Sequence, residues 1–251
     1  MQVEAVLFDL FDTLVLIEGG ETFYEPALKK LHESLTQNKI NVKYDIFKRT
    51  YFKVRDKLYD QAACKLEEPH FNVRVAQTLK KLGHRNVKHE IVSEATMSFA
   101  SEFERYVRMD PDTLPMLSRL KGTYKLGIVS NFAIPEWVLS LLDKLSLSDF
   151  FDTIVISGAV NKRKPSQEIF QKALQAIGVD SSRTVLVGDT PSMDVKGAKN
   201  AGLRTVLIKR RPVVIDSLKS GVWKPEDADD YCEPDYTIES LSELVALLKE
   251  C

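Results

Sequence analysis

The sequence has little of several features that would mark a special class of protein. Its 251 residues include three cysteines, Cys64, Cys232 and Cys251, which lie far apart and without Cys-x-x-Cys spacing. Such cysteines indicate neither a disulfide framework nor a zinc site, and the four histidines show no metal-ligand spacing. The N-terminus does not resemble a signal peptide, and no apolar run reaches membrane-spanning length. We therefore expect a cytoplasmic protein with no membrane partner.

An excess of charge of one sign is also missing. The 35 basic and 36 acidic residues leave a formal net charge of -1, which argues against a nucleic-acid surface. The short basic runs 162–164 and 209–211 are expected to lie in solvated loops, apart from Lys164. A hydrophobic content of 44% is enough for a packed core in a chain of this length. No internal repeat is visible, and the sequence favours no particular oligomeric state.

Short apolar segments rich in valine and isoleucine alternate with helical patterns along the chain. The expected strands are residues 3–8, 124–129, 153–156, 184–187 and 205–208, with a final edge strand at 234–238. The expected helices are residues 135–145, 167–177, 193–201 and 240–249. Gly178 and Gly202 stand where left-handed C-terminal caps are expected. This alternation predicts an α/β fold with a parallel sheet that helices cover on both faces.

The connection between the first two of these strands is unusually long. It runs from Asp9 to Ser130, although a crossover between parallel strands requires only a dozen or so residues. Apolar residues recur at helical spacing in three of its stretches, Tyr44–Leu58, Phe71–Leu82 and Val92–Val107. We interpret these stripes as the core of a helical cap at residues 17–108. The remaining residues, 1–16 and 109–251, then form the main domain.

Chemically active residues stand at the ends of several expected strands. Asp9, Ser130 and Asp189 each end an apolar strand. Because ligands bind outside the carboxyl ends of the strands in an open parallel sheet, all three side chains are expected in one crevice. Any one of them alone would more simply begin a local turn. Three in this order, with Lys164-Pro165 between the second and third, favour an active site.

Four fragments in this order resemble the four motifs of the haloacid dehalogenase superfamily of hydrolases. They are Phe8-Asp9-Leu10-Phe11-Asp12-Thr13, Ile128-Val129-Ser130-Asn131, Lys164-Pro165 and Gly188-Asp189-Thr190-Pro191-Ser192-Met193-Asp194. The resemblance implies a Rossmann-like core with a helical cap inserted between the first and second motifs. It also implies a hydrolase that uses an aspartate as its nucleophile.

The resemblance assigns roles to these residues for a phosphatase that acts on a small phosphorylated metabolite. Asp9 is the expected nucleophile, and Lys164 compensates the charge of the phosphate. The hydroxyl groups of Ser130 and Thr13 are expected to bind phosphoryl oxygens. Asn131 either orients the substrate or caps the local turn, and both interpretations remain open.

A Mg²⁺ cofactor follows from the same resemblance, because Mg²⁺ prefers hard oxygen ligands. The implied ligands are Asp9, Asp189 and the backbone carbonyl of Phe11. Asp194 is expected beside the ion, where it holds a ligating water or Lys164. As an acid at a helix N-terminus, Asp194 would also be favoured by the helix dipole, which is compatible with either role.

Phe11 departs from the phosphatase pattern, which is Asp-x-Asp in the first motif. The missing acid would protonate the leaving oxygen, and general acid–base catalysis contributes ~10²–10⁴-fold. Asp12 is a poor substitute, because along an extended segment it points to the opposite side unless the backbone turns sharply. We therefore expect a phosphatase that favours good leaving groups.

Two alternatives follow from Phe11. The 2-haloacid dehalogenases of this superfamily carry a non-acidic, commonly aromatic residue there, and they expel halide without Mg²⁺. These dehalogenases have no acid at the position of Asp189. Without a cation, the Asp189 carboxylate beside Asp9 would raise the pKa of one of the two carboxyl groups and weaken the nucleophile. The other alternative is a protein that binds a phosphorylated ligand or a partner but turns over poorly. The intact Asp9, Asp189, Asp194 and Lys164 argue against it. The metal-dependent phosphatase is the favoured interpretation.

Overall fold

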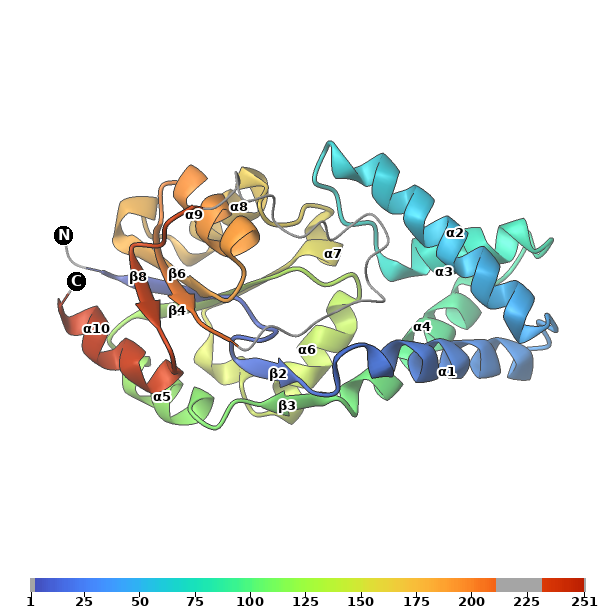
Figure 1. Ribbon diagram of the computed structural model, residues 1–251, viewed down its shortest axis with the longest axis horizontal. Helices are drawn as coiled ribbons and strands as arrows, with labels where there is room; N and C mark the ends of the chain where they lie inside the picture. The colour runs from blue at the N-terminus through green and yellow to red at the C-terminus, as the bar shows by residue number, and fades with distance from the viewer. Residues whose placement is uncertain (1–2, 211–231, 251) are drawn as a thin grey trace.

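The computed structural model describes residues 3–210 and 232–250, so that Cys251 and Arg211 lie outside the described residues. Its centre is a six-stranded sheet in the order β5-β4-β1-β6-β7-β8, with all neighbouring strands parallel (Figure 1). The strands are β1 (Ala5–Phe8), β4 (Lys125–Ser130), β5 (Thr153–Ile156), β6 (Thr184–Gly188), β7 (Arg204–Ile208) and β8 (Tyr236–Ile238). All residues of β1 and β6 are buried, as a sheet covered on both faces requires. The expected parallel α/β fold is confirmed.

Helices cover the two faces of this sheet. They are α5 (Thr113–Leu120), α6 (Pro135–Lys144), α7 (Ser157–Val160), α8 (Gln167–Ile177), α9 (Lys196–Asn200) and α10 (Leu244–Glu250), with short turns η2 (Ser148–Phe150), η3 (Ser181–Arg183), η4 (Pro191–Val195) and η6 (Leu241–Glu243). Side chains alternate along β1, so that Val6 and Phe8 pack in the cluster that includes α5, α6 and α10. Ala5 and Leu7 pack on the other face with α8 and α9.

The two central strands lie at the point where the direction of strand addition reverses. The chain passes from β1 to β4 on one side, and from β6 to β7 on the other. β1 and β6 pair from Ala5↔Thr184 to Phe8↔Val187, and the N–H of Asp9 donates to the carbonyl of Val187 at 2.8 Å. Asp9 and Asp189 therefore follow adjacent strands at the switch point, where such sheets bind ligands.

A helical insertion separates β1 from β4. It contains η1 (Gly20–Phe23), α1 (Tyr24–Gln37), α2 (Tyr44–Ala63), α3 (Phe71–Lys81) and α4 (His89–Glu104). The chain leaves along β2 (Val15–Ile17) and returns along β3 (Val107–Met109), which pair antiparallel. Figure 1 shows these helices beyond one end of the parallel sheet, and we call them the insertion. The inserted helices are as expected, while the domain division at residues 17 and 108 stays a prediction.

Some elements differ from the expected pattern. Val107 does not continue the helical stripe, because α4 ends at Glu104 and Val107 pairs with Ile17 in the β2–β3 ribbon. The helix expected at 193–201 begins as the π-type turn η4 before α9. Gly178 and Gly202 adopt the expected positive φ, +68° and +82°. Every helix among the described residues is too short or too polar to cross a membrane.

An aromatic junction joins the insertion to the sheet domain. Phe23 and Phe103 come from the insertion, and Phe11, Phe132 and Trp137 come from the loops and helix beside the sheet. The ring centroids of Phe103 lie 5.7 Å from Phe132 and 5.2 Å from Trp137, and Trp137 donates to Glu104 at 3.0 Å. Such contacts add to the free energy of burial, so the junction holds the insertion in place.

We expect Phe103→Ala to lower the free energy of unfolding by about 3–5 kcal/mol, because Phe103 is 3% exposed and its loss leaves a cavity. Urea titration followed by circular dichroism measures this loss. Leu139→Ala is the matched control, since Leu139 on α6 is 45% exposed and should change stability by about 0.5 kcal/mol or less. Similar small losses in both variants would contradict an energetic role for the junction.

Candidate active site

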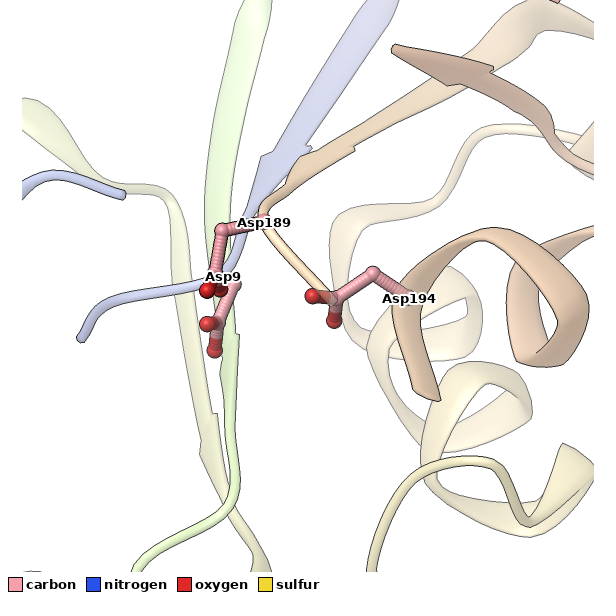
Figure 2. Close-up of side chains that lie close together, drawn as sticks. All are labelled: Asp9, Asp189 and Asp194. Carbon is pink, nitrogen blue, oxygen red and sulfur yellow. The ribbon is translucent and has the colours of Figure 1, made fainter. Parts of the chain in front are cut away.

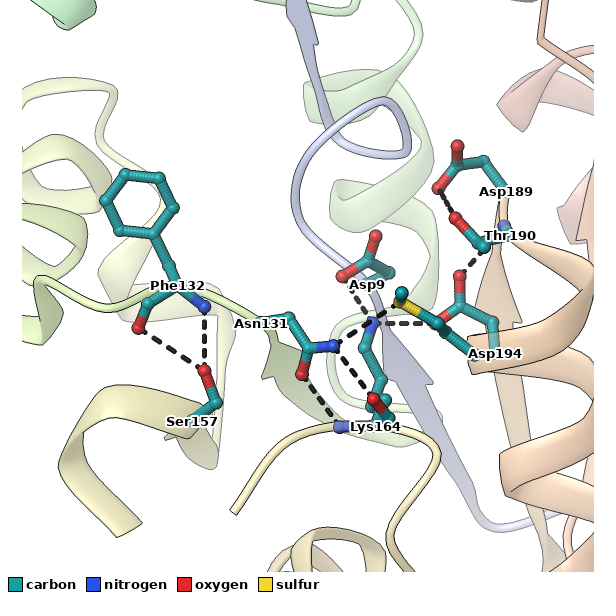
Figure 3. Close-up of polar contacts among 9 residues, drawn as sticks. Asp9, Asn131, Phe132, Ser157, Lys164, Asp189, Thr190 and Asp194 are labelled. Carbon is teal, nitrogen blue, oxygen red and sulfur yellow. Dashed lines mark hydrogen bonds and ion pairs between the residues drawn. The ribbon is translucent and has the colours of Figure 1, made fainter. Parts of the chain in front are cut away.

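Lys164 joins two carboxylates at the carboxyl edge of the sheet (Figure 3). Its Nζ lies 2.6 Å from Oδ1 of Asp9 and 2.6 Å from Oδ1 of Asp194. Burial of the ammonium opposes its charge, but Asp194 and Asp9 more than offset this and raise the pKa of Lys164 above its ordinary value. The two carboxylates therefore stabilise the charged form of Lys164 within the site.

Three carboxylates lie close together at this edge of the sheet (Figure 2). Asp9, Asp189 and Asp194 each offer an oxygen, and these atoms lie within 4.8 Å of one another. Burial raises the pKa of Asp9 to about 6, with Lys164 lowering it and Asp194 raising it further. Burial and the charges of Asp9 and Asp194 raise the pKa of Asp189 well above its ordinary value. No lysine or arginine of the described residues pairs with Asp189, so the site carries excess negative charge.

Asp194 is fixed by its own turn. Its Oδ2 accepts the N–H of Thr190 at 3.0 Å, while its Oδ1 accepts from Lys164. A Cβ at Gly188 would lie 2.4 Å from Cγ of Asp194, so only glycine leaves room for this carboxylate. The contacts of Asp194 match one of the two expected roles, the holding of Lys164.

Two hydroxyl groups near Asp9 lack partners. Thr13 and Ser130 are fully buried, and neither hydroxyl oxygen forms a hydrogen bond within the described part of the chain. Buried polar groups are nearly always hydrogen-bonded, so two such hydroxyls, one at the end of β4 and one in the loop between β1 and β2, indicate a site shaped for a polar ligand.

Asn131 contacts the main chain of Lys164. Its Nδ2 donates to the carbonyl of Lys164 at 3.1 Å, and its Oδ1 accepts the Lys164 N–H at 2.8 Å. The next residue is held too, since the N–H of Phe132 donates to Oγ of Ser157 at 2.9 Å (Figure 3). The side-chain amide of Asn131 thus positions the main chain of Lys164, a role that the sequence did not predict.

The loop after Asp9 turns sharply at Asp12, whose φ is +54°. Aspartate tolerates this left-handed conformation better than most residues. The Asp12 carboxylate accepts the N–H of Ile17 at 3.1 Å. Burial raises the pKa of Asp12, while the Ile17 bond and Arg210 oppose the rise. The backbone turn that would redirect Asp12 is thus present, and its carboxylate stabilises the loop itself.

Arg210, which follows β7, holds the loop between β1 and β2 by hydrogen bonds. Its guanidinium donates to the carbonyls of Asp12 at 2.9 Å and Thr13 at 2.7 Å, and it pairs with Asp110 at 2.9 Å. The expectation that the run 209–211 is merely solvated is therefore wrong for Arg210. Its position two residues after the end of a strand, on the edge of the sheet where the site lies, was the available signal.

Phe11 is half-buried, and its ring belongs to the aromatic junction. The ring centroids of Phe11 and Phe132 are 4.9 Å apart, and the Phe11 ring stacks at 6.1 Å on Trp137. No proton-transferring side chain therefore occupies the position two residues after Asp9.

Asn131→Ala should lower the free energy of unfolding by about 1–3 kcal/mol, because it leaves the Lys164 N–H without its acceptor. Equilibrium urea titration measures the loss. Asn38→Ala is a matched control, since Asn38 bonds at the C-terminal end of α1 and its loss should cost about 0.5 kcal/mol or less. If Asn38→Ala cost as much as Asn131→Ala, the positioning role of Asn131 would be contradicted.

Comparison with known proteins identifies the family. Residues 38–208 match the family model described as haloacid dehalogenase-like hydrolase. The chain is 29% identical over 250 residues to a glyceraldehyde 3-phosphate phosphatase of Methanocaldococcus jannaschii, with 98% of this chain and 97% of the relative covered.

Solved structures agree with this fold. A 2-haloacid dehalogenase from Pseudomonas syringae pv. Tomato DC3000 superposes with a TM-score of 0.72 at 24% identity, over 99% of each chain. A phosphatase of the family from Thermococcus onnurineus superposes with a TM-score of 0.60 at 27% identity, over 98% of each chain. The chain belongs to the haloacid dehalogenase-like hydrolases.

Proposed function

We propose that this hydrolase is a cytoplasmic, Mg²⁺-dependent phosphatase of small phosphorylated metabolites, with Asp9 as its nucleophile. The observation that carries the proposal is the Asp189 carboxylate beside Asp9, with which no lysine or arginine of the described residues forms an ion pair. A buried carboxylate and a half-buried one beside it cannot both ionise readily unless a cation lies between them. A metal-independent dehalogenase has no use for this second acid. The phosphatase relative from Methanocaldococcus jannaschii supports the same choice.

The residues present fit a magnesium ion. Their donors are hard carboxylate oxygens within 4.8 Å of one another, and Lys164 compensates only part of their charge. Asp9, Asp189 and the carbonyl of Phe11 would hold the ion, with Asp194 beside it. When bound, the ion would neutralise the carboxylates and polarise the phosphoryl group.

The side chains then divide the work of hydrolysis. The Asp9 carboxylate attacks phosphorus, forms an Asp–O–P bond and displaces the leaving group as its oxyanion. Water next attacks the same phosphorus and loses a proton to solvent, which breaks the Asp–O–P bond, releases inorganic phosphate and restores the Asp9 carboxylate. The displaced oxyanion takes up a proton from solvent. Lys164 holds Asp9 in place and compensates charge, while Ser130 and Thr13 donate to the phosphoryl oxygens.

The insertion would act as a cap over this crevice, with residues 17–108 as the moving part. The β2–β3 ribbon lies at both ends of that segment, where a hinge is required. Closure would exclude bulk water during formation of the phosphoryl-enzyme.

A dehalogenase remains the second candidate because of one observation, the aromatic ring of Phe11 two residues after the nucleophile. Expulsion of halide needs no proton, so this position needs no acid. Hydrolysis of p-nitrophenyl phosphate with Mg²⁺, measured beside halide release from 2-chloropropionate, separates the two. Mg²⁺ binding with no turnover of either substrate would instead favour a phospho-ligand-binding protein.

Mg²⁺ should bind the wild-type protein, and it should bind Asp189→Asn at least ~10-fold more weakly. The substitution replaces a charged carboxylate ligand with a neutral amide, and a loss of ~1.4 kcal/mol in binding free energy is tenfold in affinity. Isothermal titration calorimetry measures both affinities. Asp180→Asn is the control, since the Asp180 side chain is 80% exposed and lies outside the cluster. Equal affinity in all three proteins, or no binding in any, would reject the metal site.

Phe11→Asp should raise kcat for alkyl phosphates by on the order of 10²-fold, because it supplies the missing general acid. Activity on p-nitrophenyl phosphate should change little, since that leaving group needs little protonation. Phe11→Leu is the matched control, because it disturbs the aromatic junction equally and adds no acid. An unchanged kcat in Phe11→Asp, together with halide release by the wild type, would favour the dehalogenase.

A further inference from the structure

The insertion contacts the segment that carries Lys164. The loop between α2 and α3 presents two carbonyl groups to this segment. The carbonyl of Leu66 accepts the N–H of Arg163 at 2.9 Å, and the carbonyl of Lys65 accepts from Nζ of Lys162 at 3.1 Å. Since Arg163 is bonded directly to Lys164, the docking of the insertion reaches the main chain of the lysine.

The side chain of Arg163 reinforces this contact. Its guanidinium lies 5.8 Å from the centroid of the half-buried Tyr59 ring, at cation–π distance. The Tyr59 hydroxyl accepts in turn from Nη2 of Arg74 at 2.7 Å. The Tyr59 ring on α2 thus lies within cation–π distance of a guanidinium of the insertion and of one from the sheet domain.

Glu68 adds an electrostatic reason for this arrangement. It is 6% exposed, and its carboxylate forms no hydrogen bond or ion pair to any residue that the structure describes. Burial raises its pKa, while the charges of Arg163 and Arg74 act against that rise. A buried carboxylate that depends on nearby cations is strongly disfavoured when one of them withdraws. Separation of Arg163 from the insertion is therefore unfavourable.

The opposite side of the segment is held by the sheet domain. Asn131 bonds both the N–H and the carbonyl of Lys164, and Nζ of Lys164 then reaches Asp9 and Asp194 at 2.6 Å each. The lysine therefore has two supports, one from Asn131 and one from the insertion through Arg163.

We propose that Arg163 is a positioning residue, which couples the docking of the insertion to the placement of the Lys164 ammonium between Asp9 and Asp194. The proposal rests on the phosphatase function given above. Undocking of the loop 64–70 releases one support of Lys164, so the nucleophile is correctly held only beneath the docked insertion. A displacement of about 1 Å at a catalytic group can cost ~10²-fold in rate.

Other contacts also hold the insertion but leave the Lys164 segment alone. Lys144 on α6 pairs with Glu104 of α4 at 2.8 Å, and Trp137 on α6 donates to the same carboxylate at 3.0 Å. Lys144→Ala therefore weakens docking without touching Arg163, which makes it the matched control.

The test measures kcat and KM for p-nitrophenyl phosphate with Mg²⁺ in Arg163→Ala, Arg163→Lys and Lys144→Ala. Arg163→Ala should lower kcat ~10–100-fold with KM nearly unchanged. Arg163→Lys should recover part of the loss, because it restores the charge near Glu68. Lys144→Ala should retain the wild-type kcat. Equal losses of kcat in Arg163→Ala and Lys144→Ala, or no loss in Arg163→Ala, would overturn the proposal.

Hydrogen–deuterium exchange gives a second readout that requires no turnover. The amides of Arg163 and Lys164 donate to Leu66 and Asn131, so exchange in a peptide containing them should be faster in Arg163→Ala than in Lys144→Ala. Indistinguishable exchange in the two variants would overturn the coupling. An inactive wild type would overturn the phosphatase function, and these exchange rates would still decide the coupling.

Discussion

The buried contact of the Lys164 ammonium with Asp9 and Asp194 is the interaction on which the rest of the site depends. Without this cation, three carboxylates within 4.8 Å of one another would repel in a poorly solvated place. Much of the surrounding structure keeps the lysine where it is. Gly188 leaves room for Asp194, and Asn131 holds the main chain of Lys164.

The carboxylate cluster and the Phe11 ring point to different chemistries, the first to a metal-dependent phosphatase and the second to a reaction that needs no general acid. The excess negative charge around Asp189 favours a bound cation, and an anionic substrate can bind once that cation offsets the charge of the carboxylates. Phe11 removes the acid that a phosphatase ordinarily uses, and its ring contributes to the junction that holds the insertion. The two are compatible if the leaving group departs without protonation. In that arrangement, the position two residues after Asp9 serves attachment of the insertion in place of proton transfer.

Much of the sheet could be predicted from sequence, because valine- and isoleucine-rich strands buried on both faces leave little doubt about their type. The closeness of Asp9 and Asp189 could also be predicted, because the carboxyl ends of parallel strands meet at one edge of the sheet. The three-residue strands β2 and β3 could not be predicted, since so short a segment shows no alternation of apolar and polar residues. The contacts of Arg210 and Arg163 were also hidden. Each joins residues far apart in the chain, and a basic run looks the same whether it is solvated or bound.

The central claim is that Asp9 is the group that accepts the phosphoryl moiety. The most direct test is acid quenching of the protein within the first turnovers of p-nitrophenyl phosphate hydrolysis in Mg²⁺, followed by peptide mass spectrometry. The account predicts one phosphoryl group on the peptide that contains Asp9, and none when Mg²⁺ is withheld. Turnover with that peptide unmodified, or with the phosphoryl group on another residue, would contradict it.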